Sequence, residues 1–161
     1  MTYLWQFIFG LVATVGFAIL FHVPKRHIFV ASLIGGMGWV VFAYCRSDYG
    51  GALLGCFLAA CVVGFFAGIC SRVFKETATV FTIPGIIPLV PGAGMYYTTL
   101  YLISGQLEQA ATTGTETLLM AGSISVGLLV VSSFFKIHYT LAGKIKNKFR
   151  KKREKCDIME E

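Results

Sequence analysis

Long apolar stretches, separated by short gaps that hold the charged residues, fill the first 135 positions of the chain. A helix needs about 20 apolar residues, within a range of about 17–25, to cross the roughly 30 Å core of a bilayer. The gaps are too short to contain a soluble domain. The pattern therefore predicts an all-α polytopic membrane protein with five transmembrane helices, at residues 4–21, 28–45, 49–70, 77–107 and 117–135.

The composition supports this fold class. Of the 161 residues, 56% are apolar and 14% are charged, whereas a soluble domain has about 25% charged residues. Nine of the 14 basic residues and four of the 8 acidic ones lie in residues 136–161. This scarcity of charge excludes a soluble globular enzyme, a secreted disulfide scaffold and a disordered chain. We expect a five-span domain over residues 1–135 and a basic cytoplasmic tail over 136–161.

The positions of the basic residues predict the orientation, because Lys and Arg collect on the cytoplasmic side of a membrane. The gaps after the first and third spans hold Lys25, Arg26, Arg72 and Lys75, on the same side as the basic tail. Only Arg46 falls on the opposite side. We therefore expect a multi-pass protein of a bacterial plasma membrane, with its N-terminus outside and its C-terminus in the cytoplasm.

The fourth span differs from the others because Pro84, Pro88 and Pro91 lie within it. As one straight helix, its 31 uncharged residues would measure about 46 Å, which exceeds the bilayer core. Each proline lacks an N–H and clashes with the carbonyl four residues earlier, and each disfavours helical geometry in the residue before it. The span is therefore predicted to be broken or re-entrant at this segment.

A broken helix inside a membrane is also a candidate binding site. Non-helical backbone survives there only where protein buries it or where it lines a watery cavity. A second half-helix is expected to start near Gly92 and run to Ser104, and its free amides would attract a carboxylate. A structural kink without a ligand is the alternative. The candidate substrate-binding residues are Thr82, Pro84, Pro88, Pro91, Gly92, Gly94, Tyr96 and Thr98.

The third span carries a run of small residues, at positions 51, 55, 60, 64 and 68. Such a run is typical of tight helix packing in membranes, although a face of this length also suits a second subunit. The sequence holds no motif for a metal, a cofactor or a catalytic nucleophile, so we expect no cofactor and no enzymatic activity.

The proline-rich stretch at residues 81–96 (FTIPGIIPLVPGAGMY) resembles the signature of the threonine/serine exporter family. Residues 15–26 (VGFAILFHVPKR) and 33–39 (LIGGMGW) match the family in the same order. The chain is most similar to the small split subunit, which is equivalent to the C-terminal five-helix half. The resemblance implies a bacterial exporter of threonine and serine, or of a dicarboxylate such as succinate, that works with a larger five-span partner.

Two other functions stay open: a non-transporting membrane scaffold or assembly subunit, and a small homo-oligomeric channel. The basic tail is expected to contact anionic lipid, since each basic residue near such a surface contributes about 1 kcal/mol. Nucleic acid is not an expected partner, because Phe149 is the only aromatic residue within the basic run at residues 144–155.

Overall fold

The computed structural model describes residues 2–48 and 51–157 of the chain. These residues form helices and no strand, which confirms the all-α fold. The helices are α1 (Thr2–Leu20), α2 (Lys25–Asp48), α3 (Ala52–Phe74), α4 (Thr79–Ile86), the 3-10 turn η1 (Ile87–Leu89), α5 (Gly92–Ile103) and α6 (Leu107–Asp157).

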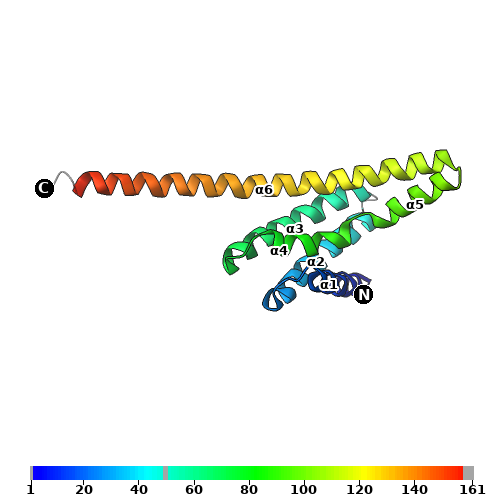
Figure 1. The fold of residues 1–161 in the computed structure, drawn as a ribbon, viewed down its shortest axis with the longest axis horizontal. Coiled ribbons are helices and arrows are strands. Elements are labelled where there is room, and N and C mark those ends of the chain that lie inside the picture. The colour runs from blue at the N-terminus through cyan, green and yellow to red at the C-terminus, as the bar shows by residue number, and fades with distance from the viewer. Residues whose placement is uncertain (1, 49–50, 158–161) are drawn as a thin grey trace.

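The described helices supply up to five membrane crossings. α1, α2, α3 and the first part of α6 are each long and apolar enough to span a bilayer. The fifth crossing combines α4 and η1 with α5, which are bent by 49° at the break between them. Because a 49° bend leaves both halves advancing in the same direction, the pair forms a broken span rather than a hairpin that returns to its starting side (Figure 1).

α2 occupies the centre of the bundle and packs against α1, α3 and α4. α6 packs along α3 and, nearer its own start, along α5 (Figure 1). The core between α2, α3, α4 and α6 is built largely from small side chains, which let the backbones approach closely. Its buried members are Ala31, Ile34, Cys56, Ala59, Ala60, Val63, Ala67, Phe81, Leu89 and Ile124.

The three glycines of α3, Gly55, Gly64 and Gly68, lie in interfaces within this chain. A Cβ at Gly55 would meet Phe42 and Cys45 of α2, and a Cβ at Gly64 would meet Leu128 of α6. Gly68 likewise faces the ring of Phe135. Steric fit with α2 and α6 therefore accounts for these small residues without a second subunit.

The residues before the last predicted span, 108–116, are helical and do not form a loop. α6 begins at Leu107, so Glu108 and Glu116 lie inside the helix rather than in a connecting loop. Gly105, at φ +76°, ends α5, and the Glu, Gln and Ala residues that follow favour helix. Charged residues such as these are compatible with a helix where their side chains face water or a polar cavity. α6 also continues past residue 135 without interruption. The predicted boundary there, between a membrane domain (1–135) and a cytoplasmic tail (136–161), stays a prediction.

The close contact of α1 with α2 gives a first test of the fold. A Cβ at Gly35 would lie 2.9 Å from Thr14 Cβ and 2.8 Å from its Cγ2, so rotation of the threonine side chain cannot relieve the overlap. We expect Gly35→Ala to lower the free energy of unfolding by about 1–3 kcal/mol, measured by denaturation in detergent. Gly16→Ala on α1 is the matched control, because its Cβ would meet nothing within 4 Å. Equal stability of the two variants would contradict this packing.

Candidate functional site

The three prolines of the fourth span have different structural effects. Pro84 lies inside α4 and is buried, so the predicted break of the span does not begin at this proline. Its missing N–H leaves one carbonyl, that of Val80, without its usual partner, and packing of α4 on α2 and α3 maintains the helix. Pro88 falls in η1, where the helix has already tightened.

The break itself lies at Val90 and Pro91. Val90 is extended (φ −63°, ψ 129°), the geometry that a following proline favours. Pro91 then precedes the first residue of α5, and no side chain caps that helix. The N–H of Met95 is bonded to Pro91 O at 3.2 Å. The earlier amides of Ala93 and Gly94 have no carbonyl in a preceding helical turn, so they can donate to a ligand.

A cavity of about 310 Å³ lies beside this break. α2, α3, the non-helical segment and the first third of α6 all contribute to its wall. Its volume lies near the lower end of the roughly 300–1,000 Å³ that is usual for small-molecule pockets. The lining residues are Trp39, Phe42, Arg46, Cys56, Pro88, Leu89, Val90, Pro91, Gly92, Ala93, Gly94, Thr113, Glu116, Thr117 and Met120.

Two charges of opposite sign line the cavity, Arg46 from α2 and Glu116 from α6. Thr113 and Thr117 lie on the same helix as Glu116, and Thr117 Oγ1 donates to Thr113 O at 2.6 Å. Sequence reasoning missed these residues because it treated Arg46 and Glu116 as loop charges outside the spans. The spacing of Thr113, Glu116 and Thr117, which places them on one face of a helix, is the signal that was available.

Four of the eight predicted site residues line this cavity: Pro88, Pro91, Gly92 and Gly94. Thr82 lies in a separate cavity of about 240 Å³ between α3, α4 and α6, and Pro84 lies in a third, of about 180 Å³. On α5, Tyr96 is exposed. Thr98 faces Gly114 of α6 and donates its hydroxyl to Gly94 O.

A larger cavity of about 510 Å³ adjoins the first, between the start of α1 and the end of α2. Trp39, Phe42 and Arg46 line both cavities and so form the wall between them. Trp39 Nε1 donates to Gln6 Oε1 at 2.7 Å, which fixes the indole against α1. The break cavity is thus separated from a wider opening by three side chains of α2.

Comparison with known proteins shows that most of the chain matches one protein family. The family described as Threonine/Serine exporter, ThrE, matches residues 6–134. An uncharacterized protein of Haemophilus influenzae is 24% identical over 140 residues, which cover 82% of this chain and 47% of the relative. The chain therefore spans about half the length of that relative. No solved structure matches the chain.

The position of the break can be tested independently of any ligand. Without the ring of Pro91, residue 90 regains helical geometry, and we expect Pro91→Ala to straighten the span. Spin labels at Ile83 and Ile103, both exposed, should then approach the separation of about 30 Å expected for one straight helix, at 1.5 Å per residue, in a background without other cysteines. Pro84→Ala is the control, since α4 is already helical there. An unchanged label distance in Pro91→Ala would show that other residues cause the bend.

Proposed function

The chain belongs to the threonine/serine exporter family, and we propose that it is a subunit of a secondary-active exporter for small carboxylate-bearing metabolites. The match supports transport of the exporter type by a multi-pass membrane protein. Threonine and serine are the first candidate substrates, and a dicarboxylate such as succinate is the second. In this proposal the substrate binds in the cavity beside the break of the fourth span.

The observation that carries this proposal is the combination of groups around that cavity. Arg46 supplies a cation, and the first amides of α5 supply further donors for a carboxylate. Glu116 supplies an anion on the α6 side. Transporters with discontinuous helices bind carboxylates at such half-helix starts. The cavity therefore suits a small solute that carries a carboxylate.

The pair of opposite charges favours an amino acid over a dicarboxylate. A zwitterion can place its carboxylate on Arg46 and its ammonium group on Glu116, whereas the second carboxylate of succinate would meet the like charge of Glu116. The hydroxyl groups of Thr113 and Thr117 lie beside Glu116, where they suit the hydroxyl of threonine or serine. We therefore place amino acids first.

The proposal includes a larger five-span partner subunit. α5 packs against α6 alone within the described residues, and none of its residues is buried. Ser123 of α6 is level with Leu53 near the start of α3, so the part of α6 before it extends about 24 Å past that start. This exposed hairpin of α5 and early α6, together with a relative about twice as long, supports a partner on this side.

The orientation and the tail complete the proposal. We propose that the ends of α1 and α3 that adjoin Lys25 and Lys75 face the cytoplasm of a bacterial cell, an orientation that their positive charge favours. The basic residues after position 135 then lie at the inner surface of the plasma membrane, where anionic lipid attracts them. α6 continues as a helix through this region to Asp157.

The charge pair predicts how substrates are distinguished. We expect Arg46→Gln to weaken binding of both threonine and succinate about tenfold or more, because each loses a charged hydrogen-bond partner. Glu116→Gln should weaken threonine binding similarly but leave succinate binding equal or stronger. Binding of each solute to the purified complex measures this, with Lys25→Gln as the control. Unaltered threonine binding in both cavity variants would place the substrate site elsewhere.

The partner can be identified by photo-crosslinking from the exposed hairpin. We expect a benzoylphenylalanine at Ile103, which is 82% exposed, to form a crosslink in native membranes to a larger membrane protein. The same probe at Phe9 of α1, also exposed, is the control and should give no such product. A crosslink only to a second copy of this chain would favour the homo-oligomeric channel.

The scaffold alternative is tested by assembly of the Arg46→Gln variant with its partner. Loss of assembly in this variant, together with wild-type export by the complexes that still form, would favour the scaffold.

A further inference from the structure

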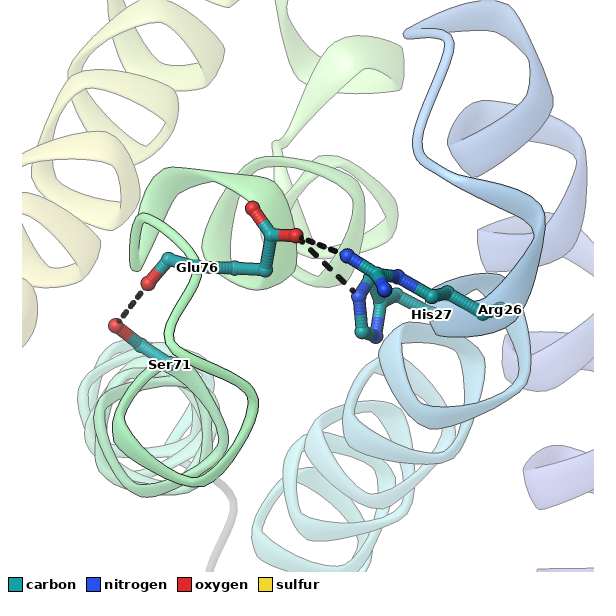
Figure 2. A network of polar contacts seen from close by, with 4 residues as sticks. All are labelled: Arg26, His27, Ser71 and Glu76. Carbon is teal, nitrogen blue, oxygen red and sulfur yellow. Dashed lines mark hydrogen bonds and ion pairs between the residues drawn. The ribbon is translucent and has the colours of Figure 1, made fainter.

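A polar cluster of Arg26, His27, Ser71 and Glu76 lies at the opposite end of the bundle from the break cavity (Figure 2). It joins the start of α2 to the turn between α3 and α4. Glu76 Oε1 accepts a hydrogen bond from Arg26 at 2.7 Å and lies 3.6 Å from His27 Nε2. Two cationic or potentially cationic groups therefore compete for one carboxylate oxygen.

His27 is the unusual member of this cluster because it is 2% exposed and carries no hydrogen bond on its ring. Neither Nδ1 nor Nε2 has a hydrogen-bond partner in the described part of the chain. The rings of Phe74 and Phe81 meet the imidazole edge-on, with centroids 4.9 Å and 5.6 Å away. A buried polar side chain normally has a hydrogen-bond partner, so this one requires an explanation.

The turn that carries Glu76 is held in place by Ser71. Ser71 Oγ donates to Glu76 O at 2.7 Å, and the Glu76 N–H donates to Ser71 O at 3.0 Å (Figure 2). Lys75, in the left-handed conformation at φ 55°, reverses the chain between them. The carboxylate is thus aimed at His27 by the backbone, and its 28% exposed side chain keeps a path to water.

Among the ionisable groups near this end of the bundle, Glu76 is the acid that faces His27. His22, Lys25, Arg72 and Lys75 are exposed, and none forms an ion pair with His27 among the described residues. α1 and α4 carry no charged residue. Protonation of His27 is therefore governed by the attraction of Glu76, by the competing charge of Arg26 and by the surrounding aromatic rings.

We propose that His27 and Glu76 form a proton-binding site that fastens the start of α2 to the turn before α4 when the proton is bound. A protonated imidazole can donate from Nε2 to Glu76 Oε1, and a charge-assisted bond shortens the contact to about 2.8 Å. Without the proton, His27 stays 3.6 Å from Glu76 with no hydrogen bond, and Glu76 pairs with Arg26, as in this structure. Histidine suits this role because it ordinarily gains its proton between pH 5 and 8.

The proton site is mechanically connected to the break. α4 begins at Thr79, three residues after Glu76, and Phe81 of α4 contacts both His27 and Phe74. The opposite end of the α4 segment is the break at Val90 and Pro91. Proton binding at His27 thus favours one position of α4 over another. The link between proton binding and transport rests on the proposed export function. In this scheme the proton leaves His27 before substrate reaches the cavity.

The proton site can be tested without transport by nuclear magnetic resonance of the full chain with ¹⁵N-labelled histidine in lipid nanodiscs. The His27 signal, identified by its loss in His27→Asn, should change as the pH is lowered and a proton binds. Glu76→Gln should move its midpoint down by about one pH unit, and Arg26→Gln should move it up, because one removes an attraction and the other a repulsion. Midpoints that do not move in either variant would overturn the proposal. The His22 signal is the internal control.

Its coupling to transport is tested by threonine exchange in proteoliposomes that contain the chain with the subunit that purifies with it. Equal pH on both sides removes any proton gradient. Exchange by the wild type should slow about threefold or more from pH 8 to pH 6 as His27 gains its proton, and His27→Asn should abolish this dependence. His22→Asn, the matched control, should retain it. Wild-type pH dependence in His27→Asn would overturn the coupling, whereas absence of wild-type exchange at every pH would overturn the proposed function alone.

Discussion

The interruption of the fourth span at Val90 and Pro91 is the constraint around which the rest of the fold is arranged. Neither residue is helical, so this part of the span does not satisfy its backbone groups as a continuous helix would. Val90 N–H reaches only the Ile87 carbonyl, and Gly92 N–H reaches only Val90 O. Lipid supplies no hydrogen bonds, so such a backbone persists where protein covers it or where a cavity admits water. The cavity beside the break, with its charges and hydroxyl groups, meets this requirement.

Close packing of small residues holds the broken span in the bundle. Gly38 of α2 meets Val63 of α3, and Gly85 of α4 lies against the same valine. Gly127 of α6 approaches so closely that a Cβ there would lie 2.9 Å from the carbonyl of Phe57. Because lipid tails give helices no hydrophobic reason to associate, this steric fit provides much of the attraction. This packing holds α4 against α2 and α3, whereas α5 contacts α6 alone within the described residues. The first half of the span is therefore held by more neighbours than the second.

Residue pattern predicted the all-α fold, the five spans and the start of α5 at Gly92, since apolar length and proline chemistry are local properties. It failed where tertiary contacts decide the outcome. Pro84 remains helical because α2 and α3 support it. Glu116, predicted to lie between two spans, lines a cavity that only the folded chain creates. His27 follows the basic residues Lys25 and Arg26 in the sequence but is buried against Phe74 and Phe81, which come from positions more than 40 residues away.

The broken span reaches both polar regions of the bundle. Near the start of α4, Glu76 faces Arg26 and His27, and at the start of α5 the cavity holds Arg46 and Glu116. In the proposed mechanism a change of charge at the first region moves α4 about the hinge at Val90, and the wall of the cavity moves with it. A continuous helix would transmit the same displacement to α5 and so to the hairpin that is proposed to bind the partner. In this mechanism the break at Val90 and Pro91 allows the proposed substrate site to change shape while α5 and α6 stay together.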